Sequence, residues 1–349
     1  MTKAAELAKM GEVLTNSQIG RKNIIINSGM QISQRSTSET GLGAASGFFT
    51  LDRFYMIEND ASAGRFTMSQ SAVTDLEGFS NALKIDCTTA DTSIAAGEAL
   101  IIQQKIEGFN AQQLKATSTT TRAMTLSFYA KSNASRAIAS EIGMSNGTNN
   151  SASKLHTIGT SWARYTFTVP AASSTQIDND NSNEMQVNFW LHAGSTFTSG
   201  TMSASLEPVT NANRAAGIGS IFASTDNEIE ITGVQLEVGS VATPFEHKSF
   251  GEELILCSRY YQDFTEGNTI VRGYGYNNTS GMDNPFTFKT PMRAAPTMTE
   301  TSGSDAGSNS DLTNFGNIKT HGCDFNTDPS PQNNQSNYYQ FQFTADAEL

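Results

Sequence analysis

Charged and aromatic residues are both scarce in this sequence, at 16% and 9% of its 349 residues. Long solvent-exposed helices are rich in charged and long aliphatic side chains, and these are sparse here. Ser, Thr, Asn and Gly fill much of the remainder, a composition that favours short strands joined by polar turns. The composition therefore predicts an all-β protein.

Basic residues are in the minority, with 22 Lys and Arg against 34 Asp and Glu and a net charge of −12. A surface of this sign repels a phosphate backbone and gains nothing from counterion release. We therefore expect no nucleic-acid partner. Residues 1–22 reverse the balance, with four basic and two acidic side chains. This end either docks on an acidic partner or carries ordinary solvated charge.

Cysteine is rare, and long apolar runs are missing. Cys87, Cys257 and Cys323 are odd in number and far apart, which fits neither metal-ligand spacing nor a disulfide framework. Residues 1–22 lack the apolar core of a signal peptide, and no run approaches the roughly 18 apolar residues that span a bilayer. We expect reduced thiols, no membrane partner and synthesis in a cytoplasm.

Motifs for metal binding or catalysis are also missing. The four histidines are isolated from one another and from the cysteines. The loop from Asp178 to Glu184 alternates oxygen ligands but lacks the glycine at the sixth position of a calcium loop. Gly159 to Ala163 departs at its last position from the pattern of a nucleophile elbow. We therefore expect no metal, no cofactor and no enzyme activity, although a spatial pair of carboxylates leaves no trace in a sequence.

The order of patterns along the chain predicts four segments. Residues 1–22 form a short helix, residues 23–247 a jelly-roll β-sandwich, residues 248–264 a bridging helix, and residues 265–349 a small β-sandwich. In the first segment Leu7, Met10 and Leu14 share one helical stripe. Because so short a helix is marginal in water, we expect this stripe to serve attachment or oligomerisation.

The bridging helix is predicted from Ser249 to Gln262. Ser249 and Glu252 have the spacing of a capping box, in which each side chain bonds the other residue's backbone N–H. The residues expected on its packed face recur at helical spacing. They are Phe250, Leu254, Cys257 and Tyr261.

Strand alternation singles out candidate glycan contacts, because successive side chains point to opposite faces. From Met185 to His192, one face is apolar and the other carries Gln186, Asn188, Trp190 and His192. From Met124 to Lys131, Tyr129 likewise points away from the apolar face. An aromatic ring among amides suits a sugar. The alternative is that Trp190 and Tyr129 lie beneath a loop or at a subunit interface.

The C-terminal segment offers a second set of candidates. Tyr274, Tyr276, Tyr338 and Tyr339 stand among Asn and Gly, a composition typical of antibody binding loops. We include Tyr274, Tyr276 and Tyr338 among the candidate glycan contacts. The alternative is that part of this set packs in a β core.

Several blocks resemble a family of phage tail-fibre-type and virion structural proteins. They are GRKNIIINSGMQISQRSTS, TLDRFYM, ITGVQLEVGSVATPFEHKSFGEELILCSRYYQ and the ending FTADAEL. Within residues 23–246, the runs NIIINSGMQ, MTLSFYAK, TSWARYTFTVP and EIEITGVQLEVG also resemble the jelly-roll fold of carbohydrate-binding modules. The first resemblance implies a virion location and a homotrimer. The second implies a carbohydrate-facing ancestry.

Together these observations predict a fibre-type adhesin of a bacteriophage virion. We expect residues 1–22 to bind another virion protein, and the sandwich or the tip to contact a host surface glycan. One alternative is a capsid decoration or head-fibre protein with no receptor role. The other is a depolymerase that cleaves surface polysaccharide.

Overall fold

The chain is described from a computed structural model. The structure describes residues 22–60, 62–146, 148–173, 175–266, 269–274, 283–305, 312–327 and 336–349, together with Lys3, and for residues 269–274, 283, 304–305, 312–313, 327 and 336–339 the backbone alone. Two compact units divide the chain, one up to Glu253 and one from Leu254 to Glu348, and Leu349 groups with the first. The predicted attachment residues Leu7, Met10 and Leu14 lie outside the described residues.

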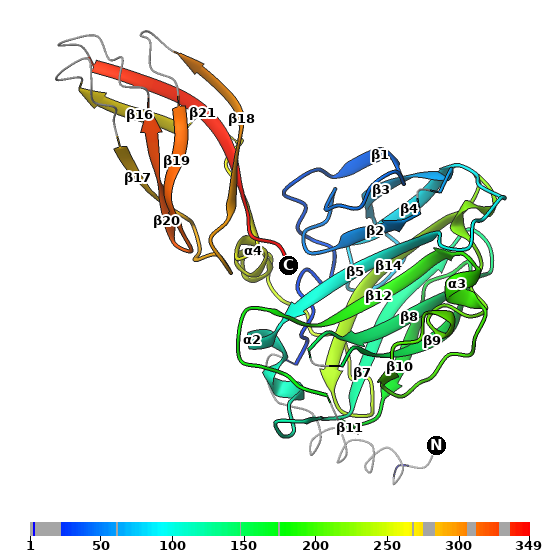
Figure 1. The fold of residues 1–349 in the computed structure, drawn as a ribbon. Helices are drawn as coiled ribbons and strands as arrows, with labels where there is room; N and C mark the ends of the chain where they lie inside the picture. Colours follow the sequence, from blue (N-terminus) through cyan, green and yellow to red (C-terminus); the bar gives the residue numbers. More distant parts are fainter. Residues whose placement is uncertain are drawn as a thin grey trace. The chain divides into compact units, whose positions relative to one another are not determined.

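The first unit is a jelly-roll β-sandwich of two six-stranded antiparallel sheets (Figure 1). Sheet A has the order β1 (Ser38–Leu42), β3 (Arg65–Ala72), β4 (Asn81–Thr89), β14 (Glu228–Val238), β7 (Met124–Ser132), β10 (Ala163–Val169). Sheet B has the order β13 (Glu207–Pro208), β9 (Asn150–Ile158), β8 (Arg136–Met144), β12 (Asn183–Ala193), β5 (Ala99–Glu107), β2 (Tyr55–Asn59). The chain crosses repeatedly between the sheets, as between β4 and β5. The all-β prediction is confirmed.

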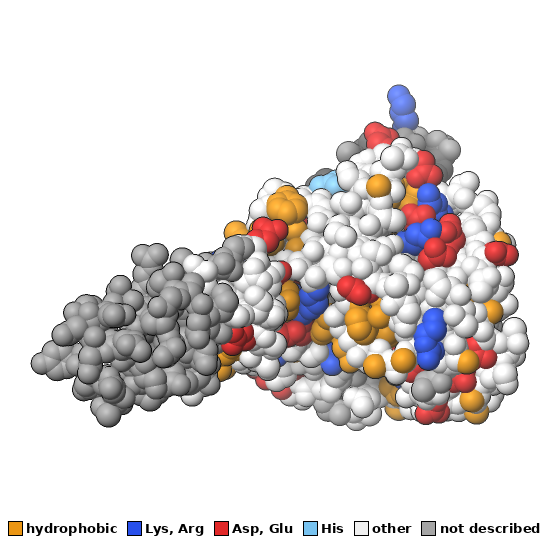
Figure 2. Space-filling model, turned by 90° about the horizontal axis from the view of Figure 1, so that it is seen from above, with side chains coloured by type: hydrophobic (Ala, Val, Ile, Leu, Met, Phe, Trp, Pro, Cys, Tyr) orange, Lys and Arg blue, Asp and Glu red, His pale blue; other side chains and the backbone are white. Residues whose placement is uncertain are grey.

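Short elements connect these strands. They are α2 (Gly108–Ala111), η1 (Gln112–Leu114), the pair β6 (Thr120–Thr121) and β11 (Ala172–Ser173), α3 (Ser195–Thr198), η2 (Asn211–Asn213) and η3 (Ile221–Ala223). Most of the surface in Figure 2 is formed by uncharged atoms, and several acidic and basic side chains lie beside one another. The described residues of that face form no continuous basic stripe of the kind that follows a phosphate backbone.

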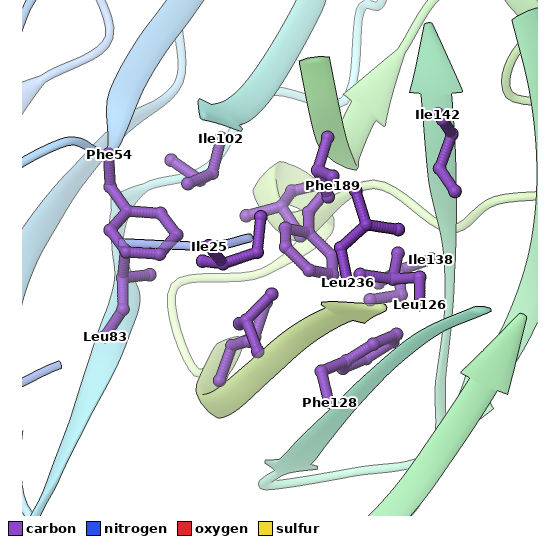
Figure 3. Close-up of a cluster of buried hydrophobic side chains, with 14 of the residues drawn as sticks. Ile25, Phe54, Leu83, Ile102, Leu126, Phe128, Ile138, Ile142, Phe189 and Leu236 are labelled. Atoms are coloured by element: carbon purple, nitrogen blue, oxygen red, sulfur yellow. The ribbon is translucent and has the colours of Figure 1, made fainter. Parts of the chain in front are cut away.

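The core of the first unit lies between the two sheets (Figure 3). Phe128 of β7 meets Phe189 of β12 edge to face, with ring centroids 4.9 Å apart. Such pairs add about 0.5–1.5 kcal/mol to the stabilisation that comes from buried area. The apolar faces predicted for β7 and β12 are confirmed as core residues. They are Met124, Leu126, Phe128, Met185, Val187, Phe189 and Leu191.

A bulge in β14 depends on Gly233. The pairing with β7 shifts register between Thr232 and Gln235, and Gly233 has a φ of +59°. That left-handed conformation disfavours residues with a Cβ. A Cβ here would also lie 2.7 Å from the ring of Phe79 and 2.9 Å from that of Tyr129. The bulge therefore lets two aromatic side chains lie directly against the backbone of β14.

The predicted bridging helix is α4 (Phe250–Ser258), which is shorter than expected. The capping box forms, with Glu252 N–H donating to Ser249 Oγ at 3.3 Å and Ser249 N–H donating to Glu252 Oε2 at 3.4 Å. Tyr261 begins strand β15 (Tyr261–Asp263), because its backbone pairs with β21 (Ser336–Asp346) instead of continuing the helix. Phe250 is 59% exposed, so it does not belong to the packed face predicted for it.

The second unit is a small sandwich of a four-stranded and a three-stranded antiparallel sheet. The larger sheet contains β15, β16 (Thr269–Tyr274), β18 (Thr297–Asp305) and β21 (Ser336–Asp346), and the smaller one β17 (Asp283–Thr287), β19 (Leu312–Lys319) and β20 (Gly322–Thr327). Phe325, Phe341 and Phe343 lie in its core, with Phe325 and Phe341 packed edge to face at 4.9 Å. The prediction of a small C-terminal β-sandwich is confirmed.

Candidate functional site

The face of sheet B that points away from the core gathers polar side chains from four strands. Tyr55 of β2 pairs with Gln103 of β5, Gln103 with Asn188 of β12, and Asn188 with Glu141 of β8. Side chains directly opposite one another in antiparallel strands lie about 4.5–5.5 Å apart at Cβ. These four residues therefore form a continuous line across the sheet, which we refer to as the polar row.

Glu141 ends the polar row with a buried carboxylate that is fully hydrogen-bonded. The Arg214 guanidinium donates from Nε to Oε2 at 2.9 Å and from Nη2 to Oε1 at 2.7 Å. Trp190 Nε1 donates to Oε2 at 3.1 Å, and Asn188 Nδ2 donates to Oε1 at 2.9 Å. A buried charge is tolerated only when it is paired and hydrogen-bonded. Here each oxygen receives two donors.

Gln103 continues the polar row and leaves one acceptor unpaired. Its Nε2 donates to Asn188 Oδ1 at 2.9 Å. Its Oε1 is buried and has no donor within the described part of the chain. A buried acceptor without a partner costs about 1–3 kcal/mol. A molecule that supplied a donor here would recover that cost.

Gln186, two residues before Asn188 on β12, provides a half-exposed amide. Its Oε1 accepts from Ser145 Oγ at 2.6 Å and from Asn183 Nδ2 at 3.2 Å, which leaves Nε2 without an acceptor among the described residues. The side chain lies across Gly143, where a Cβ would come within 2.5 Å of Nε2. Asn183 Oδ1 is a second buried acceptor without a donor in the described structure. The surroundings of Gln186 thus offer a donor and an unpaired acceptor.

Trp190, Asn188 and His192 are fully buried, which corrects the prediction that they contact a glycan. The segment 194–218 covers this part of sheet B. Phe197 of α3 lies 5.2 Å from the Trp190 ring, and the Arg214 guanidinium lies 4.7 Å from its centroid. Trp190 therefore belongs to a small apolar cluster beneath this segment. Trp190 thus lies beneath a loop, which was one of the alternatives to glycan contact.

His192 belongs to a buried hydrogen-bonded network at one end of β12. Its Nδ1 lies 2.7 Å from Ser220 Oγ and its Nε2 lies 3.1 Å from Glu98 Oε2. Burial lowers the pKa of His192, although the Glu98 carboxylate acts in the opposite direction. The order of groups resembles a Ser-His-Glu triad, but Ser220 Oγ also accepts from Phe222 N–H and the ring of His192 is 0% exposed. The network can stabilise the end of the sandwich, and it presents no path for a substrate to His192.

Tyr129 lies on the outer face of sheet A and therefore not beside the polar row. Its ring is half-exposed and contacts Phe79, with centroids 5.2 Å apart. The Arg164 guanidinium lies 5.9 Å from the Tyr129 ring. Because β7 and β12 belong to different sheets, their outer faces point in opposite directions, and Tyr129 and Gln186 cannot contact one small ligand.

The C-terminal tyrosine candidates are only partly described. Tyr274 ends β16 and Tyr338 lies in β21, where these strands pair with Tyr274 opposite Ser336 and Arg272 opposite Tyr338. The structure describes their backbone alone, and Tyr276 lies outside the described residues. Their role in glycan contact stays a prediction.

In the acidic loop from Asp178 to Glu184, protein donors reach Asp178 and Asp180, whereas Glu184 Oε2 is buried without a partner among the described residues. Asp178 accepts from Gln176 and from Asn146, each at 2.8 Å, and these hydrogen bonds lower its pKa. The described residues contain no group of three His, Cys, Asp or Glu side chains placed to hold a metal ion. None of the helices in the described part of the chain is both long and apolar enough to cross a membrane.

The sequence did not identify Gln103, Glu141 and Arg214. Glu141 stands in the apolar run IASEIGM, and Gln103 in the run LIIQQKI. A lone acidic residue in an otherwise apolar strand signals a buried, paired carboxylate. That signal could have identified Glu141, but its partner Arg214 is 73 positions away in a loop. Only the folded chain brings the two together.

No protein-family model and no curated protein matches this sequence. Solved structures with a related fold include a bacteriophage CBA120 tailspike protein 4 enzymatically active domain, at 13% identity and a TM-score of 0.32, covering 62% of this chain and 21% of that one. TmCBM61 in complex with β-1,4-galactotriose has 9% identity and a TM-score of 0.31, covering 62% and 99%. The cellulose-binding domain of Cellulomonas fimi β-1,4-glucanase C has 12% identity and a TM-score of 0.27, covering 60% and 100%. Likenesses this distant add no argument about function.

Proposed function

We propose that the first unit binds glycans on the outer face of sheet B, and that the protein is a fibre-type adhesin of a bacteriophage virion. The observation that carries the first part is the set of unpaired polar groups beside a half-exposed aromatic ring. Gln103 Oε1 and Asn183 Oδ1 need donors, and Gln186 Nε2 needs an acceptor. Tyr55 lies next to Gln103 at the edge of the same face.

A sugar matches this set of groups. Each sugar hydroxyl both donates and accepts a hydrogen bond, so the hydroxyls of an oligosaccharide can pair with unpaired amide oxygens and nitrogens alike. The C–H face of a sugar ring can also stack on an aromatic side chain. Tyr55 is half-exposed and is held by Phe48, whose ring centroid lies 4.8 Å away.

The virion part of the proposal rests on the sequence resemblance to phage tail-fibre-type proteins. In this proposal residues 1–22 bind another virion protein, the chain is a homotrimer, and the ligand is a glycan of the host surface. Deleting residues 1–22 is then expected to leave a soluble, folded protein that no longer joins the particle. Normal incorporation of the truncated chain would contradict the attachment role.

Glycan binding is tested with a panel of bacterial surface polysaccharides and titration of those that bind. Gln186→Ala and Tyr55→Ala should each weaken binding about tenfold, since one lost hydrogen bond or ring contact is worth about 1 kcal/mol. The matched control is Thr166→Ala, an exposed polar change on β10 of sheet A. Equal losses in all three variants, or none in the first two, would contradict the assigned face.

Two further outcomes identify the alternatives. A shell location in the virion without binding to any glycan of the panel would indicate a capsid decoration protein. Release of new reducing ends from a polysaccharide would indicate a depolymerase. Imaging the particle and assaying reducing ends therefore separate the three functions.

A further inference from the structure

Glu141 fixes the orientation of the amide groups in the polar row. All four groups that reach this carboxylate are donors, and a carboxylate beside a guanidinium can only accept. The Asn188 side chain must therefore turn its Nδ2 toward Glu141. Its Oδ1 then faces Gln103, whose Nε2 donates to it at 2.9 Å. The remaining acceptor, Gln103 Oε1, is the last group of the polar row.

This orientation decides what chemical group the end of the polar row can bind. If either amide were reversed, two donors or two acceptors would face each other inside the row. Gln103 is 6% exposed, and such a mismatch is strongly unfavourable in a buried position. The row therefore presents an acceptor at Gln103. Asn183 presents a second one, because its Nδ2 is bound by Ser145 Oγ at 3.1 Å and by Gln186 Oε1.

We infer that this face selects ligands that offer hydrogen-bond donors, such as sugar hydroxyl or N-acetyl groups, over ligands that offer only acceptors, such as carboxylates and phosphates. The inference rests on the proposed glycan-binding function and names the ligand class of that site. A carboxylate could pair with Gln186 Nε2 and with the ammonium of Lys105, the cross-strand neighbour of Gln186, but it would leave both buried acceptors unpaired. A neutral oligosaccharide offers hydroxyl donors to the two buried acceptors and a hydroxyl acceptor to Gln186 Nε2. Glu141 is a positioning residue in this arrangement and does not itself contact the ligand.

Gln103 Oε1 lies just below the surface, so a neighbour must shift before a ligand donor reaches it. Tyr55 is the direct cross-strand neighbour of Gln103, is half-exposed and stands on the edge strand β2. Its ring contacts Phe48 at 4.8 Å and the Lys105 ammonium at 5.9 Å, and it is the side chain that must turn aside for a ligand to reach Gln103 Oε1. The same ring that stacks on the sugar thus uncovers the acceptor.

The decisive variant is Glu141→Gln. It keeps the shape of the side chain, but its amide can donate as well as accept hydrogen bonds. When the new amide nitrogen takes the position of Oε1 it can donate to Asn188 Oδ1, and Arg214 Nη2, which donated to that position, must move away. Both amides of the row can then turn over and present Gln103 Nε2 to the ligand. We expect affinity for neutral oligosaccharides to fall about tenfold and the preference for neutral over carboxylate-bearing oligosaccharides to shrink by at least the same factor. Glu237→Gln is the matched control, since Glu237 is a buried carboxylate on the outer face of sheet A.

A second variant guards against loss of folding in the first. Gln103→Met has nearly the same shape, leaves Glu141 and Arg214 untouched and removes the acceptor at this position. The row then ends at Asn188 Oδ1, in a side chain that is 0% exposed against 6% for Gln103. This variant should lose the preference for neutral ligands without gaining affinity for acidic ones. Neutron crystallography of the wild type gives a readout without ligand, because it locates the amide deuterons of Asn188 and Gln103.

The outcomes separate the two proposals. Binding to no glycan of the panel removes the proposed function, and the selectivity with it. Glycan binding whose preference is unchanged in both Glu141→Gln and Gln103→Met overturns the selectivity and leaves the function standing. Deuterons that place Gln103 Oε1 toward Asn188 in the wild type would also overturn it.

Discussion

The outer faces of the two sheets satisfy their polar groups in different ways. On sheet A, Lys131 lies 3.2 Å from Asp75 and 3.6 Å from Glu230, and Trp162 Nε1 donates to Asp75 at 2.8 Å. These groups are partly exposed and pair with one another or with water. On sheet B, the polar row is buried and fully paired at its Glu141 end, but it ends in an unpaired acceptor at Gln103. Among the described residues sheet A leaves a buried donor unpaired, Arg164 Nε, whereas sheet B leaves buried acceptors unpaired at Gln103 and Asn183, so the two faces would suit different ligand groups.

The largest difference between the faces should appear when each tryptophan is truncated. Trp190→Ala removes a side chain that is 0% exposed and should lower the free energy of unfolding by about 3–5 kcal/mol. Trp162→Ala removes a half-exposed side chain on sheet A and should cost about 1 kcal/mol or less. Urea denaturation measures both. Equal losses would mean that the segment 194–218 does not cover sheet B as described.

The contact between the sheets should weaken in acid because of His156. The ring of this β9 residue meets Phe128 of β7 edge to face at 5.2 Å, and burial lowers its pKa from 6.5 to about 4. The unfolded chain therefore binds a proton below pH 6.5 that the folded chain does not bind until about pH 4. Stability is full above pH 6.5 and falls by about 3 kcal/mol as the pH drops to 4. His156→Gln should remove this part of the pH dependence, and an unchanged slope would show that His156 is not the cause.

Removal of one cation from each face should separate a buried ion pair from an exposed one. Arg214→Met leaves the Glu141 carboxylate, which is 1% exposed, without its cation and should cost about 2 kcal/mol or more. Lys131→Met leaves Asp75, which is 58% exposed, free to bind water and should cost about 1 kcal/mol or less. Thermal and urea unfolding give both values. A smaller loss for Arg214→Met than for Lys131→Met would contradict the ranking.

The smallest effect on stability is expected at Gly143. In Gly143→Ala the new Cβ pushes aside the flexible Gln186 side chain, so stability should change by about 1 kcal/mol or less while glycan affinity falls about tenfold. Gly219→Ala is the control, because the nearest atom to its Cβ would be the backbone oxygen of Ala137 at 3.8 Å. Titration and unfolding of the two variants separate positioning of Gln186 from general destabilisation.

Much of the fold could be predicted from the sequence because its signals are local. Alternation in MQVNFWLHA assigned Phe189 to the core and Trp190 to the opposite face, and both directions are correct. The capping box at Ser249 placed the start of α4. The end of α4 was wrong, because pairing of Tyr261 with β21, a contact across 85 positions, overrides the helical pattern. Helical spacing cannot register such a contact.

The candidate site was predicted only in part, and Gln186 and Trp190 show why. Alternation put both on the same face of β12, but it carries no information on what lies above them. The segment 194–218 covers Trp190 and leaves Gln186 half-exposed. The stacking surface expected at Trp190 is therefore occupied by Phe197 and Arg214. Tyr55, which stands at the exposed end of the polar row, has no signal in the sequence that sets it apart from other strand tyrosines.

The sequence by itself determined which side chains of each strand face the core, because that alternation follows from the geometry of a single strand. Only the tertiary structure decided that Gln103, Asn188 and Glu141 meet. Asn188 is 85 positions from Gln103 and 47 from Glu141, and their pairing follows from strand order and register in sheet B. Register between distant strands is set by the packing of the whole core, so no local pattern contains it.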